Sequence, residues 1–152
     1  MTLTEITNPE PERVIITQRH INQPLVAVYK AWTTPSILKN WWGPKGFTNT
    51  FNEFNLEPGG YWRFIMHGPD GKNYPNESQF VSITPLRKLV FNHITPPRFQ
   101  VIASFEKAGD HATQVTFTMI FDTATTRQQL APIVVPANEE NFDRLEAVLQ
   151  NM

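Results

Sequence analysis

The sequence predicts an α+β fold, in which a curved antiparallel sheet of about six to seven strands wraps around a long C-terminal helix and two short helices follow the first strand. Three observations predict this arrangement. Short segments rich in β-branched and aromatic residues, separated by Gly and Pro turns, fill the middle of the chain. Two brief segments with helical spacing precede most of these strands. The last segment repeats its apolar residues at steps of three and four, which is typical of a helix with one apolar face.

Length and composition indicate one domain. The chain has 152 residues, of which 40% are hydrophobic, and this is enough for a single core. The first residues are polar, include Pro9 and Pro11, and show no apolar periodicity. We therefore expect a flexible N-terminal arm over residues 1–12 and a single domain over residues 13–152.

Charge and residue content exclude several classes of protein. With 13 Lys and Arg against 14 Asp and Glu, the chain lacks the basic excess that binding to nucleic acid requires. The sequence has no Cys, which excludes disulfides, thiolate metal sites and thiol catalysis. Its start has neither the basic nor the apolar region of a signal peptide, and no apolar run approaches the ~20 residues of a membrane-spanning helix. We expect a cytoplasmic protein without membrane insertion.

The first strand and the two short helices occupy the N-terminal third. A β-branched cluster predicts a strand over residues 13–21. Pro24 suits a first helical turn, and the apolar spacing after it predicts a helix over residues 25–32. Pro35 starts a second helix in the same way, and this helix ends before Gly43.

A meander of five or six strands follows. Pro and Gly in the segments 57–60 and 68–71 supply tight turns, and residues 113–121 show the clearest alternation between apolar and polar side chains. The expected strands cover residues 47–56, 61–67, 76–83, 88–94, 99–107 and 113–121.

The C-terminal segment has helical composition with an interruption. Pro132 and Pro136 do not fit the interior of one continuous helix, so we expect a break there and a terminal helix over about residues 137–150. Because an antiparallel meander exposes one apolar face, we expect the apolar side of this helix to cover the sheet.

Several sequence segments resemble the bacterial homologues of the C-terminal domain of the heat-shock protein 90 ATPase activator, a family of the START-like (SRPBCC) superfamily. The similarity extends over about residues 13–149. The segments that carry it are Ala31-Trp32-Thr33-Thr34-Pro35, Trp41-Trp42-Gly43-Pro44-Lys45-Gly46-Phe47, Leu56-Glu57-Pro58-Gly59-Gly60-Tyr61-Trp62-Arg63-Phe64 and His67-Gly68-Pro69-Asp70-Gly71. The resemblance implies a helix-grip (START-like, Bet v-like) fold with an apolar cavity between the sheet and the C-terminal helix.

Large apolar side chains on the predicted strands and helices are candidates for the wall of such a cavity. From sequence, the same side chains suit a solid core equally well. The candidates are Trp42, Trp62, Phe64, Met66, Phe91, Met119, Phe142 and Leu145.

Polar candidates are few. His93 and Glu77 are the polar groups that we expect could reach the cavity, although a hydrogen-bonded His93 and a solvent-facing Glu77 are the simpler interpretations. The four His residues are scattered without ligand spacing, so we expect no metal site. No catalytic residue or cofactor is predicted, because no nucleophile, phosphate-binding or dinucleotide-binding motif occurs.

These observations favour a protein that binds an apolar, aromatic or lipid-like small molecule, present as a monomer or homodimer. Two alternatives stay open. The family resemblance implies a co-chaperone that stimulates a heat-shock ATPase, but the namesake carries an additional N-terminal domain, so we do not expect this partner here. A cyclase-like or hydrolase-like enzyme would need two titratable groups inside the same cavity.

Overall fold

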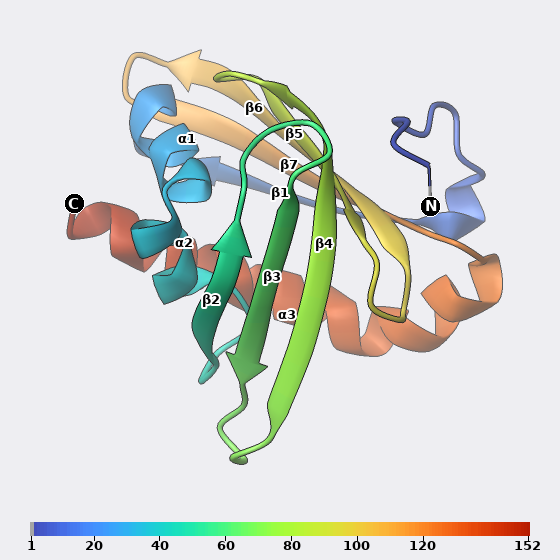
Figure 1. The fold of residues 1–152 in the computed structure, drawn as a ribbon. Coiled ribbons are helices and arrows are strands. Elements are labelled where there is room, and N and C mark those ends of the chain that lie inside the picture. Colours follow the sequence, from blue (N-terminus) through green and yellow to red (C-terminus); the bar gives the residue numbers. More distant parts are fainter. Residues whose placement is uncertain (1) are drawn as a thin grey trace.

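A curved antiparallel sheet surrounds one long helix (Figure 1). The structure is a computed structural model and describes residues 2–152. A single 3₁₀ turn, Pro11–Arg13, precedes the first strand. The elements after it are β1 (Val14–Ile21), α1 (Leu25–Thr33), α2 (Pro35–Trp41), β2 (Thr48–Phe54), β3 (Tyr61–His67), β4 (Asn73–Thr84), β5 (Lys88–His93), β6 (Phe99–Gly109), β7 (Ala112–Phe121) and α3 (Ala124–Gln150).

The sheet has seven strands in the order β1-β7-β6-β5-β4-β3-β2, so the chain meanders from β2 to β7 and the first strand completes the far edge. Register shifts at Asn52 in β2 and at Val81 in β4 interrupt the ladders. Such bulges bend strands and increase their twist. Figure 1 shows β2, β3 and β4 turned away from the direction of the other strands. The predicted fold class is confirmed.

One strand begins earlier than the sequence suggested. β4 starts at Asn73 rather than at residue 76, and it includes Pro75. Pro75 pairs with Ile65 of β3, while β5 pairs with β4 only from Ser78 onward. The missing N–H of Pro75 therefore removes no hydrogen bond between β4 and β5.

The break expected in the C-terminal helix is wrong. α3 runs without interruption from Ala124 to Gln150, with Pro132 and Pro136 inside it. Each Pro lacks the N–H that would bond to the carbonyl four residues earlier, on Gln128 and Pro132. Gln128, Pro132 and Pro136 are all exposed. The two carbonyls without a helical partner therefore lie on the solvent side, where water can hydrate them.

The core lies between the concave face of the sheet and the second half of α3, with α1 and α2 closing the end near β2 (Figure 1). The apolar face predicted for α3 is buried at Phe142, Leu145 and Leu149. Arg19 of β1 fixes the same helix from outside, through ion pairs with the carboxylates of Glu139, Asp143 and Glu146 at 2.9, 3.0 and 3.0 Å.

Four indole rings form a continuous cluster in this core. Trp42 is central: its ring centroid lies 5.8 Å from that of Trp32, 5.7 Å from that of Trp41 and 5.0 Å from that of Trp62. Trp41 is buried and its Nε1 donates a hydrogen bond to the carbonyl of Ala31 at 3.0 Å, whereas Trp42 is half-buried. Trp41 is therefore held in the core by its own hydrogen bond, while the neighbouring Trp42 is less buried.

The N-terminal arm lies along the convex face of the sheet. The carbonyls of Thr2 and Thr4 accept hydrogen bonds of 2.9 Å from the side-chain amides of Asn92 and Gln100. The backbone N–H of Ile6 donates to Oε1 of Gln100 at 2.8 Å. The arm thus covers two buried amides on adjacent strands, a role that the sequence did not indicate.

Candidate functional site

The concave face holds a cavity of about 110 Å³. Its walls come from the middle strands of the sheet and from Trp42, the residue that follows α2. The lining residues are Trp42, Trp62, Phe64, Met66, Asn76, Ser78, Phe91, His93 and Phe99.

Strand alternation explains this wall. Trp62, Phe64 and Met66 are alternate residues of β3 and point inward, while Arg63 between them points outward. An engineered apolar cavity of about 150 Å³ accepts benzene, so the space here suits a molecule of about one small ring.

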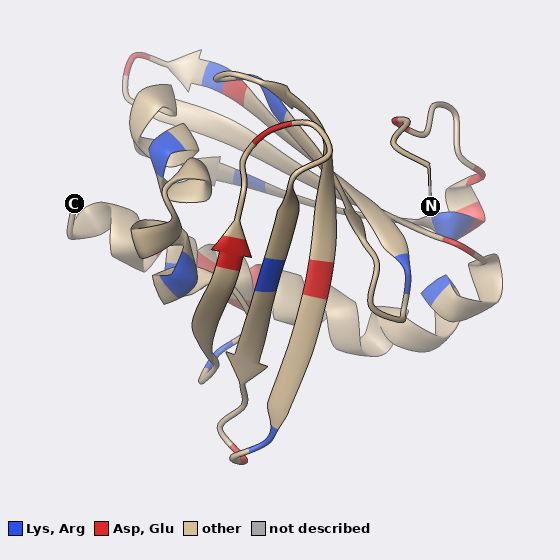
Figure 2. Cartoon of the chain, viewed as in Figure 1, with Lys and Arg blue, Asp and Glu red and all other residues tan. Residues whose placement is uncertain are grey.

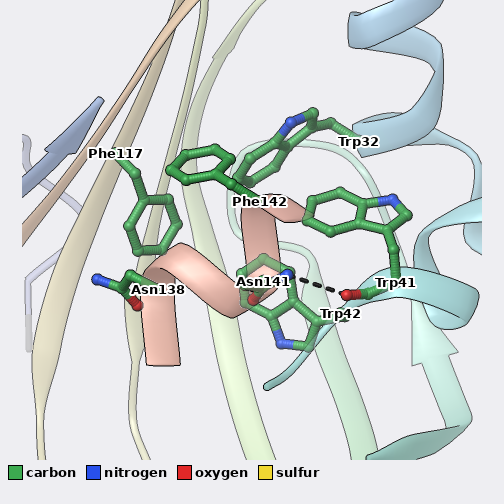
Figure 3. A pocket seen from close by; sticks show the side chains of 7 residues that line it. All are labelled: Trp32, Trp41, Trp42, Phe117, Asn138, Asn141 and Phe142. Atoms are coloured by element: carbon green, nitrogen blue, oxygen red, sulfur yellow. Dashed lines mark hydrogen bonds between the residues drawn. The ribbon is translucent and has the colours of Figure 1, made fainter. Parts of the chain in front are cut away.

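A narrower cleft lies against α3 (Figure 3). It measures only about 10 Å³, because Phe142 and Phe117 fill the space next to the helix. Figure 3 shows Asn141 above Trp42, with its amide directed to the backbone of Trp41; the Nδ2–O distance is 2.9 Å. Trp42 lines both the cleft and the larger cavity, and thus separates them.

Three neighbouring strands contribute a row of residues with polar side-chain atoms to the cavity wall. In the ladder Ser78 of β4 stands between Trp62 of β3 and His93 of β5. Trp62 is 2% exposed and Ser78 is 1% exposed. Neither Nε1 of Trp62 nor Oγ of Ser78 has a hydrogen-bond partner within residues 2–152. Unpartnered buried groups of this kind are rare and costly in folded proteins.

His93, by contrast, is fully engaged. Its Nδ1 lies 2.9 Å from the carbonyl of Pro97, and its Nε2 lies 2.7 Å from Oδ1 of Asn76. Its ring stacks on Phe99, with centroids 4.5 Å apart. Burial lowers the pKa of His93 more than its hydrogen bonds to the carbonyls of Pro97 and Thr95 raise it. Burial therefore favours the uncharged form of His93.

The structure brings together six of the residues that the sequence suggested for the cavity: Trp42, Trp62, Phe64, Met66, Phe91 and His93. The three other apolar candidates lie where α3 packs against the sheet. Phe142 lines the narrow cleft, while Leu145 is fully buried in the core. Met119 is buried too, and its Sδ accepts a hydrogen bond of 3.4 Å from Asn138. The cavity therefore lies beside α3, against the sheet, since the side chains of α3 fill the space beneath that helix.

Glu77 lies outside the cavity. Neighbouring residues of a strand point to opposite faces, so Glu77 projects from the convex face while Asn76 and Ser78 project inward. There it forms an ion pair of 2.7 Å with Nε of Arg63, which also contacts Glu53. Figure 2 shows this basic position on β3 between acidic positions on β2 and β4.

Sequence reasoning missed three lining residues. Asn76, Ser78 and Phe99 belong to the wall but were not among the candidates. Alternation within the strand predicted over residues 76–83 would have placed Asn76 and Ser78 on one face. Their position beside Trp62 and His93 depends on strand register, which the single sequence does not contain.

Metal chemistry and membrane spanning have no support in the described part of the chain. Among residues 2–152 no group of three or more His, Asp or Glu is arranged to hold a metal ion. No helix there is both long and apolar enough to cross a membrane.

The curved seven-stranded sheet, the long C-terminal helix and the apolar interior define a helix-grip domain of the START-like (SRPBCC) class, a fold that commonly binds hydrophobic ligands. The sequence model described as "Activator of Hsp90 ATPase homolog 1-like protein" matches residues 22–150, and the chain belongs to this family. The family resemblance seen in the sequence is confirmed.

Solved structures agree with this fold. A protein from Nitrosomonas europaea superposes with a TM-score of 0.86 at 20% identity, covering 93% of this chain and 97% of its own. One from Arthrobacter aurescens gives 0.85 at 20% identity, with 99% and 94% covered. An AHSA1-like protein from Aeromonas hydrophila gives 0.72 at 22% identity, with 91% and 92% covered. No curated protein matches the sequence.

Proposed function

We propose that this protein binds a small apolar molecule of about one ring in the cavity on the concave face of its sheet. The observation that carries the proposal is the cavity itself: about 110 Å³, lined mainly by aromatic side chains, in a fold that commonly binds hydrophobic ligands. The cavity volume favours an aromatic or branched compound over a full-length lipid.

Burial of apolar surface would drive binding. A ring the size of an aromatic side chain buries about 200 Å². At about 25 cal/mol per Å² this contributes about 5 kcal/mol before the cost of association is subtracted. Burial alone therefore supports a Kd no tighter than about the millimolar range. A tighter complex would need polar contacts in addition.

The lining argues for binding over catalysis. Among the described residues that form the wall, His93 is the one titratable group. A general acid and base would need a second titratable group facing the same ligand. The same proposal includes a cytoplasmic location, which is consistent with a chain that has no Cys.

The test begins with native mass spectrometry of the purified protein, followed by extraction and identification of anything that accompanies it. Titration with toluene, followed by ligand-observed NMR, then tests the cavity directly. We expect Ser78→Phe, which places a ring inside the cavity, to abolish toluene binding. Thr116→Phe is the control: Thr116 lies on β7, away from the cavity lining, and should leave binding unchanged. An unchanged toluene titration in Ser78→Phe, in a folded variant, would refute the proposal.

A further inference from the structure

The polar row in the cavity wall restricts the class of ligand. Nε1 of Trp62 is a hydrogen-bond donor and never an acceptor, and Oγ of Ser78 can donate as well. Both atoms are buried and without a partner within residues 2–152, and both residues line the cavity. Trp62 and Ser78 therefore bring two unpartnered donors to one side of the wall, beside Asn76 and His93, whose polar atoms contact each other.

We propose that the cavity selects small ring compounds that carry a neutral carbonyl oxygen, an aldehyde or ketone, which accepts hydrogen bonds from Trp62 and Ser78. This inference rests on the proposed function and names its ligand class. The two residues are cross-strand neighbours on β3 and β4, so one oxygen with two lone pairs can serve both donors. The ring of the ligand then contacts the aromatic walls.

The neighbourhood of this pair favours a neutral oxygen over a carboxylate. Uncharged His93 has a single N–H, and each of its ring nitrogens already lies within hydrogen-bond distance of a protein group, the carbonyl of Pro97 or the side-chain amide of Asn76, so no N–H is left for a ligand. Lys and Arg are absent from the wall within the described residues. A carboxylate would enter this space without a counter-ion, so its desolvation makes its binding weaker than that of a neutral carbonyl.

The purified full chain can be titrated with three compounds that share one ring: toluene, benzaldehyde and benzoate. We expect benzaldehyde to bind about tenfold more tightly than toluene, which corresponds to about 1.4 kcal/mol. Benzoate should bind most weakly. In the NMR spectrum the indole N–H signal of Trp62 should move downfield with benzaldehyde and stay in place with toluene.

Two variants remove the donors but keep the cavity apolar: Trp62→Phe and Ser78→Ala. In each the preference for benzaldehyde over toluene should fall to about threefold or less, while toluene still binds. Trp32→Phe is the matched control. Nε1 of Trp32 is likewise buried without a partner in the described chain, but Trp32 lines the narrow cleft and not the cavity. Its removal should leave the preference intact.

The possible failures are distinct. Equal affinity for toluene and benzaldehyde, or an unchanged preference in both donor variants, would overturn the carbonyl proposal and leave apolar binding standing. Tighter binding of benzoate than of benzaldehyde would also overturn it, because a charged ligand would then be preferred. Failure of toluene and benzaldehyde alike to bind would overturn the proposed function with it.

Discussion

Replacing Arg144 by Met is expected to lower the free energy of unfolding by about 3 kcal/mol, because this side chain joins α3 to the connection between α2 and β2. Its guanidinium donates hydrogen bonds to five backbone carbonyls. From Nη1 the distances are 3.2, 2.8 and 3.0 Å to Trp42, Gly43 and Pro44, and from Nη2 they are 3.1 and 2.8 Å to Asn40 and Phe47.

The magnitude follows from the burial of these bonds. Four of the five are partly buried and the bond to Asn40 is exposed. A hydrogen bond contributes about 1 kcal/mol net, and one to a charged group contributes more. Nη1 has two hydrogens for its three carbonyls, so the four partly buried contacts amount to about three full hydrogen bonds. Their loss costs about 3 kcal/mol, which lowers Tm by about 6–12 °C at this size.

The assay is urea unfolding, followed by far-ultraviolet circular dichroism, together with calorimetry for Tm. Arg127→Met is the matched control, since it removes from the same helix one hydrogen bond, of 3.1 Å to the carbonyl of Val14. It should cost about 1 kcal/mol. Arg144→Lys should recover less than half of the loss, because an ammonium does not span carbonyls on both sides. A loss within about 1 kcal/mol for Arg144→Met would refute this reasoning.

Three further predictions concern α3, the cavity wall and the connection between α2 and β2. Pro132→Ala and Pro136→Ala should each stabilise the protein by about 1 kcal/mol or more in thermal unfolding, because each restores a helical N–H donor; destabilisation would contradict the account of α3. Because burial lowers the pKa of His93 from its usual value of 6.5, the unfolded chain takes up the proton first as the pH falls. The free energy of unfolding should therefore decrease as pH drops below about 6.5, and His93→Gln should flatten this dependence. An opposite slope would refute this account. Gly43→Ala should cost about 1 kcal/mol by urea unfolding and weaken toluene binding, because φ is +98° and the new Cβ would lie 2.7 Å from Cε of Met66; unchanged stability would argue against a rigid loop.

Local patterns were sufficient for much of the fold. The bounds of β3 agree with the sequence prediction, and its alternation correctly separated Trp62, Phe64 and Met66 from Arg63. Turn residues on both sides of β3 fixed its ends, and the period of two fixed its faces. These features depend on residues close in sequence, which is why sequence reasoning captured them.

Features that depend on the surroundings were not predictable in the same way. Pro132 and Pro136 argue locally for a break, but the helix tolerates them because their freed carbonyls face solvent. The pairing of Ser78 with Trp62 and His93 requires the registers of two ladders. Phe142 was a candidate for the cavity wall as a large apolar side chain, yet it fills the space beneath α3.

The indole cluster determines what optical measurements of this protein report. All four Trp residues of the sequence belong to that one cluster, and two of them, Trp42 and Trp62, line the cavity. Indoles in contact exchange excitation energy, so the emission of the whole protein responds to a quencher placed beside either of these two rings. Intrinsic fluorescence is therefore a label-free monitor of cavity filling. A fluorescence melting curve follows the part of the molecule around this cluster, because α3 itself contains no Trp.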